Sequence, residues 1–185
     1  MKPPRIKPKG LDDYLEQLSK GVFQAGISWH VVEMKWSGIS TAFHGFKVER
    51  VARMGDREID KLAQDERVIR SRPKIAAIVH NARAILDLER AEGFKEHLAS
   101  FTQYDELATD LKKRFKFVGD SGAYHFLWSV SHPVPDWHEW AKEHGKSWGG
   151  ASGGATKKAT KTVTKKPTKK ATPRRTATVR SKAKR

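Results

Sequence analysis

Cysteine is absent from the 185 residues of this chain. Disulfide bonds and cysteine-ligated metal sites are therefore excluded. The sequence also has no uninterrupted apolar run of about 18 residues, so it is not expected to span or bind a membrane. Its first ten residues, MKPPRIKPKG, are basic but no apolar segment follows them, so they do not read as a secretory signal. These absences favour a cytoplasmic globular protein.

Acidic residues are missing from the C-terminal part of the chain. Residues 151–185 hold 13 Lys or Arg and no Asp or Glu, whereas residues 1–150 hold 24 basic and 21 acidic residues. A segment built mainly of Lys, Thr, Ala, Arg and Pro cannot bury enough apolar surface to fold. We therefore predict a basic N-terminal arm over residues 1–9, a Gly-rich linker over residues 145–156 and a disordered basic tail over residues 157–185.

The tail carries most of the net charge of +16. Blocks of like positive charge usually bind polyanions. We expect the tail to contact DNA through lysines such as Lys157, Lys158, Lys165 and Lys166. The alternative is a tail that only keeps the protein in solution.

The body of the chain, residues 10–144, predicts an all-α domain. Apolar residues recur at spacings of three and four, as in LDDYLEQLSKGVF, which places them on one face of a helix. No segment alternates apolar and polar residues for long enough to indicate a strand. Helices are expected over residues 11–23, 28–46, 47–54, 56–66, 73–93, 104–115 and 123–132, with Pro73 in a first turn and Gly93 at a helix end.

The stretch FKFVGDSGAY, residues 115–124, predicts two helices joined by a tight turn, a helix-hairpin-helix unit. Gly119 would allow a positive φ, and Asp120 or Ser121 would cap the second helix. The backbone amides at the start of that helix could bind a DNA phosphate. The alternative is that Gly119 only ends the first helix. The predicted DNA contacts here are Lys116, Val118, Gly119, Ser121 and Gly122.

Four stretches together resemble the type I 3-methyladenine DNA glycosylases. They are FQAGISW, AFHGFKVERVA, RVIRSRPKIAAIVHNARAIL and LKKRFKFVGDSGAYHF, in the family's order and covering about residues 10–132. The resemblance implies an all-helical glycosylase that flips an alkylated adenine out of double-stranded DNA and cleaves its N-glycosidic bond, as a first step of base-excision repair. It implies no cofactor, and we expect a monomer associated with the nucleoid.

The same resemblance places the base pocket under FQAGISW, with Gly21, Phe23, Gln24 and Trp29 as its residues. Trp29 stands where the family has a pocket aromatic, and base stacking on an aromatic ring contributes about 1–3 kcal/mol. Alternatively, Trp29 belongs to the core, because Trp36 and Phe43 lie on the same helical stripe.

The chain departs from the family in three respects. Position 21 is Gly where most members carry a Glu that hydrogen-bonds the methylated base, and no Tyr-x-x-Tyr-His motif precedes residue 10. The family's Cys and His zinc ligands find no match, so we expect no metal site. Glu16 lies about 140° around the helix from position 21 and is interpreted as a solvated charge.

Asp136 is the candidate catalytic carboxylate, because related helix-hairpin-helix enzymes use an Asp roughly twenty residues after the hairpin glycine. The alternative is that Asp136 caps the helix WHEWAKEH. The sequence as a whole predicts a base-excision glycosylase for alkylated bases. The alternative function is a catalytically inactive DNA-binding protein with a glycosylase fold.

Overall fold

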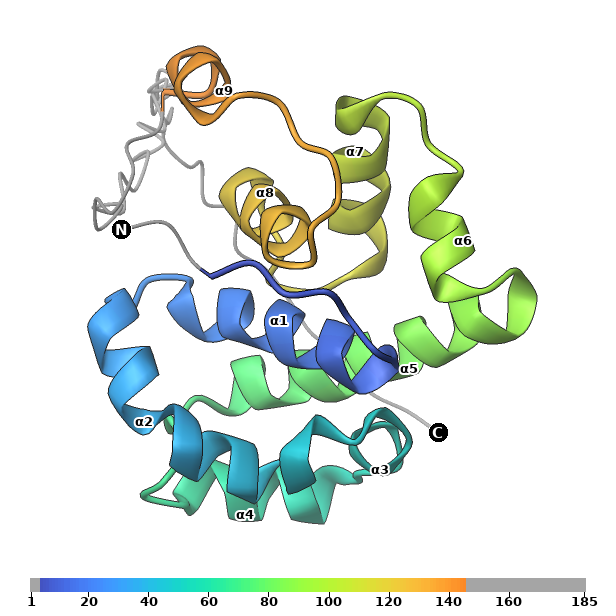
Figure 1. Cartoon of the computed structure of the whole chain (residues 1–185). Helices are drawn as coiled ribbons and strands as arrows, with labels where there is room; N and C mark the ends of the chain where they lie inside the picture. The colour runs from blue at the N-terminus through green and yellow to red at the C-terminus, as the bar shows by residue number, and fades with distance from the viewer. Residues whose placement is uncertain (1–3, 146–185) are drawn as a thin grey trace, which may run out of the picture. The chain divides into compact units, whose positions relative to one another are not determined.

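The computed structural model describes residues 4–145, and Figure 1 shows their helical arrangement. No strand occurs in this part of the chain, so the predicted all-α class is confirmed. The elements are α1 (Leu11–Gln24), α2 (Trp29–Ala42), the 3-10 turn η1 (His44–Phe46), α3 (Val48–Ala52), α4 (Asp56–Gln64), α5 (Arg72–Ala91), α6 (Phe94–Ala99), α7 (Tyr104–Arg114), α8 (Asp120–Ser129) and α9 (Trp137–Glu143).

The longest helix, α5, is the centre of the packing. It begins with Pro73 in its first turn, as predicted. Its fully buried Ile75, Ile78, Ala82 and Ile85 follow the helical spacing of three and four. α5 packs against α1, α3, α4 and α6, and α1 runs beside it in Figure 1. α5 therefore provides the base on which α1 and the turn after it are positioned.

Three predictions about the helices were wrong or incomplete. The helix expected over residues 28–46 ends at Ala42, because the chain turns through Gly45 with φ 65° into η1. A short helix, α6, follows Gly93 and had no clear periodic signal. The second hairpin helix, expected over residues 123–132, spans Asp120–Ser129, and its N-cap residue is Gly119 and not Asp120 or Ser121.

The described part of the N-terminal arm lies against the end of α8. The Ile6 amide donates to the Ser129 carbonyl at 2.7 Å, and the Ser131 hydroxyl donates to the Ile6 carbonyl at 2.8 Å. The Arg5 guanidinium lies 4.7 Å from the centre of the Trp128 ring. These contacts fix the arm where Pro4 reaches the pocket described below.

Two further predictions concern the C-terminal part of the chain and membrane-spanning segments. The predicted linker beyond Gly145 and the predicted tail, with Lys157, Lys158, Lys165 and Lys166, lie outside the described residues. Within residues 4–145, none of the helices combines the length and apolar character needed to cross a membrane.

Candidate functional site

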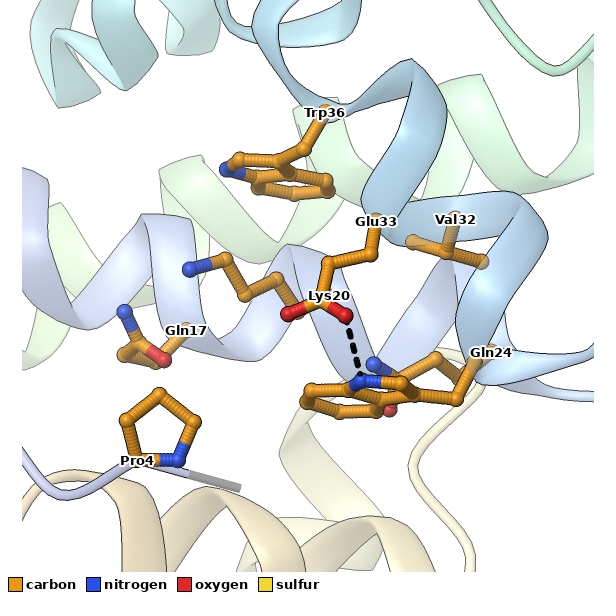
Figure 2. Close-up of a pocket in the computed structure, with 8 residues that line it drawn as sticks. Pro4, Gln17, Lys20, Gln24, Val32, Glu33 and Trp36 are labelled. Atoms are coloured by element: carbon orange, nitrogen blue, oxygen red, sulfur yellow. Dashed lines mark hydrogen bonds between the residues drawn. The ribbon is translucent and has the colours of Figure 1, made fainter. Parts of the chain in front are cut away.

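A pocket of about 130 Å³ opens between α1 and α2 (Figure 2). A single water needs roughly 10–15 Å³, so the pocket has room for a small planar molecule. Both helices and the arm supply its lining, which is Pro4, Gln17, Lys20, Gln24, Trp29, Val32, Glu33 and Trp36. Figure 2 shows the Glu33 carboxylate and the Lys20 ammonium pointing into the space between Trp36 and Pro4.

The turn between α1 and α2 is fixed at both of its ends. Gly26 adopts φ 81°, a conformation that L side chains rarely take, and Ser28 caps α2 by accepting from the Val31 amide at 3.3 Å. Lys74 of α5 is buried, and its ammonium donates to the carbonyls of Phe23 at 2.8 Å and Ala25 at 2.6 Å. Burial lowers the pKa of Lys74. The turn therefore presents Trp29, the first residue of α2, in a defined position.

Trp29 and Gln24 are the two predicted base-pocket residues that line this pocket. The Trp29 side chain is half-buried, and its indole Nε1 donates to Glu33 Oε2 at 2.9 Å; Figure 2 draws this bond as a dashed line. Trp29 is therefore part of a pocket wall and not of the closed core.

The other two predicted pocket residues lie differently. Phe23 is fully buried and contacts Trp36 and Phe43 edge-on, so it supports the pocket from within the core. Gly21 is absent from the lining, and a Cβ placed there would meet no atom within 4 Å.

Trp36 forms the other aromatic part of the wall. Its ring stacks on Phe46 at a centroid distance of 5.2 Å, and Phe46 stacks in turn on Phe43 at 5.4 Å. The Trp36 indole Nε1 donates to Glu16 Oε1 at 2.8 Å. The interpretation of Glu16 as a solvated charge was therefore wrong: its side chain is only 31% exposed because it packs beside Trp36 and Lys20.

Sequence reasoning missed Glu33, Lys20, Gln17 and the arm residue Pro4 as pocket residues. Glu33 follows Trp29 by four positions, so the two share a helix face, and this spacing was the available signal. Trp36 continues that face one turn later. The contribution of Pro4 comes from an arm that carries no periodic pattern, so only the tertiary structure reveals it.

The hairpin between α7 and α8 is attached to α5 by the sequence HNA. The fully buried Asn81 donates to the Lys116 carbonyl at 3.1 Å and accepts from the Lys116 amide at 2.8 Å. His80 Nε2 lies 3.1 Å from the Arg114 carbonyl. These contacts hold the turn of the hairpin in place over residues 115–119.

The predicted positive φ at Gly119 was wrong. Gly119 has φ −92°, and the left-handed turn falls on Phe117 at φ 59°, whose side chain is 46% exposed. Gly119 and Lys116 are exposed, Ser121 and Gly122 are half-buried, and Val118 is buried. The hairpin therefore leaves the start of α8 and the Gly119 backbone open to the surface.

Part of the positive charge near the hairpin is already paired. Lys112 Nζ lies 2.7 Å from Asp120 Oδ1, and Arg114 Nε lies 2.8 Å from Asp110 Oδ2. Within the described residues, Lys113 and Lys116 make no ion pair. These two exposed lysines are the hairpin charges that remain available to an anion.

Asp136 caps α9, as one of the two interpretations predicted. Its carboxylate accepts from the amides of His138 at 2.8 Å and Glu139 at 3.3 Å. It is exposed and does not line the α1–α2 pocket. The catalytic interpretation of Asp136 remains a prediction.

Titratable side chains do not gather into a metal site within the described range. No three His, Asp or Glu residues of positions 4–145 lie close enough together to hold an ion. Among residues 4–145, the α1–α2 pocket combines room for a small ligand with aromatic side chains in its wall.

Comparison with known proteins identifies the chain's relatives. Residues 8–108 match the family model described as methyladenine glycosylase. The chain is 36% identical over 126 residues to DNA-3-methyladenine glycosylase 1 of Escherichia coli K12, covering 56% of this chain and 67% of that protein. It is 33% identical over 129 residues to DNA-3-methyladenine glycosylase of Haemophilus influenzae, covering 58% and 70%.

Solved structures give the same result. A crystal structure of 3-methyladenine DNA glycosylase I superposes with a TM-score of 0.61 at 31% identity, covering 68% of this chain and 81% of that one. A variant of 3-methyladenine DNA glycosylase I in complex with 3-methyladenine superposes with a TM-score of 0.61 at 26% identity, covering 68% and 79%.

Proposed function

This chain belongs to the methyladenine glycosylase family, and from that premise we propose that it removes alkylated bases such as 3-methyladenine from double-stranded DNA. The observation that carries the proposal is the aromatic pocket between α1 and α2, with Trp29 in its wall. A base inside a duplex is out of reach of such a pocket, so the nucleotide has to be flipped out of the stack before it binds.

Cleavage of the N-glycosidic bond needs little catalysis from the protein, because an N3-alkylated adenine in DNA is a cation and already a good leaving group. When the bond between the sugar C1′ and the base nitrogen breaks, its electron pair passes to the base and neutralises it. The sugar is left with oxocarbenium character and is captured by water. Holding the nucleotide in position and stabilising the positive sugar supply the remaining catalysis.

Asp136 is proposed as the carboxylate that stabilises the sugar. In the structure Asp136 Oδ1 also caps α9, accepting from the amides of His138 and Glu139. Asn caps a helix about as well as Asp, so Asp136→Asn removes the charge and leaves the cap. A large loss of base release with unchanged stability supports the role, and full activity contradicts it.

DNA contact is proposed for the hairpin and the tail. The open start of α8, the Gly119 backbone and the free Lys116 suit a phosphate of the duplex, with Val118, Ser121 and Gly122 shaping the turn. The tail lysines add a sequence-independent attraction that raises residence on DNA. We propose a monomer that associates with the nucleoid in the cytoplasm.

The alternative is a DNA-binding protein of this family without base-cleaving activity. The observation that favours it is Gly21, which has no side chain at the position where most members carry a carboxylate according to the resemblance. In that case the protein would bind damaged or distorted duplexes and release no base.

The deciding experiment incubates the purified full chain, in excess, with duplex DNA treated with a methylating agent. Free 3-methyladenine is expected in the supernatant, and unmethylated duplex should release nothing above the rate in buffer. If no base is released while an abasic-site duplex is still bound, the enzyme proposal fails and the alternative replaces it. If neither occurs, both proposals fail.

A further inference from the structure

We propose that Glu33 makes the α1–α2 pocket selective for positively charged planar bases over neutral ones. The proposal rests on the proposed function for its biological meaning, but the binding preference can be measured independently. The geometry that points to it is a carboxylate exposed inside a pocket whose walls include two indole rings.

The position of Glu33 is set by Trp29. The bond of 2.9 Å from the Trp29 indole Nε1 uses one lone pair of Glu33 Oε2. A carboxylate has about four acceptor sites, and among the described residues only the Trp29 indole donates to Glu33, so acceptor sites remain for a ligand. Figure 2 shows the Glu33 side chain reaching across from α2 towards the space between Trp36 and Pro4. A flat ligand that stacks in this pocket therefore meets a carboxylate, which accepts from its amino groups and attracts its charge.

Glu33 is also the uncompensated charge of the pocket. Lys20 Nζ lies 3.5 Å from Glu16 Oε1, so these two opposite charges balance one another beside Trp36. Within residues 4–145, Glu33 has no Lys, Arg or His partner at ion-pair distance. Lys20 and Glu33 line the pocket, and Glu16, which is not a lining residue, contacts both Lys20 and Trp36. Together these three side chains carry one net negative charge, and the carboxylate that lines the pocket is that of Glu33.

The aromatic walls act in the same direction. The faces of indole rings are negative and attract cations, and the effect is larger when the cation is removed from water. The Lys20 ammonium already lies 5.1 Å from the centre of the Trp36 ring, so Trp29 is the ring whose attraction a bound cation would gain. A methylated cationic base would gain from Trp29 and from Glu33 together, while a neutral base would gain mainly from stacking.

Glu33→Gln isolates the charge. The amide oxygen of Gln still accepts from the Trp29 indole, so the wall keeps its position while the negative charge is lost. The matched control is Glu49→Gln on α3, an exposed carboxylate 3.3 Å from Arg53 that does not line this pocket. Thermal unfolding of both variants checks that the fold is unchanged.

The experiment compares 1-methylnicotinamide, a planar cation, with nicotinamide, its neutral counterpart, using tryptophan fluorescence of the full chain. The wild type and Glu49→Gln should bind the cation at least about tenfold more tightly than the neutral probe. Glu33→Gln should lose most of that preference and keep its affinity for the neutral probe. An unchanged preference in Glu33→Gln, or no preference in the wild type, overturns the proposal.

Base release from methylated duplex is measured on the same three proteins. If the wild type prefers the cationic probe but releases no base, the proposed function fails and the role of Glu33 in the pocket stands. If the wild type releases base and Glu33→Gln releases it at the same rate and with the same probe preference, the proposed function stands and the role of Glu33 falls.

Discussion

Lys74 is predicted to hold the pocket turn in place, and Lys74→Met tests this. The substitution keeps most of the side-chain volume but removes two charge-assisted hydrogen bonds, to the carbonyls of Phe23 and Ala25. Hydrogen bonds to charged groups contribute about 1.5–3 kcal/mol each. Two effects reduce this loss in the variant. Water can hydrogen-bond to the Ala25 carbonyl, because Ala25 is exposed. Met also avoids the free-energy cost of burying an ammonium group, which is seen in the lowered pKa of Lys74. The expected net loss is about 2–3 kcal/mol.

The assay is thermal and urea unfolding of the full chain, with Lys35→Met as the matched control. Lys35 also donates to a backbone carbonyl, that of Glu66 at 2.8 Å, but it is exposed and its bond competes with water. At roughly 3 °C per kcal/mol, Lys74→Met should unfold about 6–9 °C below the wild type, with little change for Lys35→Met. Equal unfolding temperatures for the two variants would refute the role assigned to Lys74.

Three further predictions follow from the same structure. Gly21→Ala should stabilise the protein by about 0.5–1 kcal/mol, because Gly21 is helical with open space around it. Gly93→Ala should destabilise it by about 1 kcal/mol, because φ is 84° at this position. Urea unfolding in which both variants change the free energy of unfolding in the same direction contradicts this. Asn81→Leu should weaken duplex binding of the full chain by freeing the Lys116 backbone, and filter binding at fixed salt with unchanged affinity would count against it. Burial lowers the pKa of His125 and His132 below 6.5, so the unfolded state takes up protons first as the pH drops. The free energy of unfolding of the wild type should therefore fall from about pH 7.5 to 5.5, and the variant with both histidines changed to Gln should show a flatter profile. A wild-type profile as flat as that of the variant would contradict this.

The helices were largely predictable because local patterns determine them. Leu15, Leu18 and Val22 repeat at three and four positions and are all buried on one side of α1. Ser28 caps α2 and Pro73 lies in the first turn of α5, and both are local choices that sequence alone reveals. The short α6 was missed because six residues make too few turns for a periodic signal.

The pocket was predictable only in part. Trp29 was predicted from the motif FQAGISW. The role proposed for Glu33 depends on the hydrogen bond it accepts from the Trp29 indole and on the lack of an ion-pair partner among the described residues, and neither can be read from the sequence. Glu16 was misjudged because helical geometry relates it to position 21 and says nothing about Trp36, which comes from another helix. The positive φ was assigned to Gly119 by residue preference, whereas the attachment of the hairpin to Asn81 places it on Phe117.

The central claim is that the α1–α2 pocket takes the excised base, and NMR of the tryptophan indole N–H groups tests it most directly. The full chain is titrated with 3-methyladenine, and the Trp29 and Trp36 signals are assigned from Trp29→Phe and Trp36→Phe. Both signals should shift with the same saturation, while those of Trp137 and Trp140, which are buried in a separate aromatic cluster, should not move. Saturable shifts confined to Trp137 and Trp140, or no saturable shift at any indole, would contradict the account.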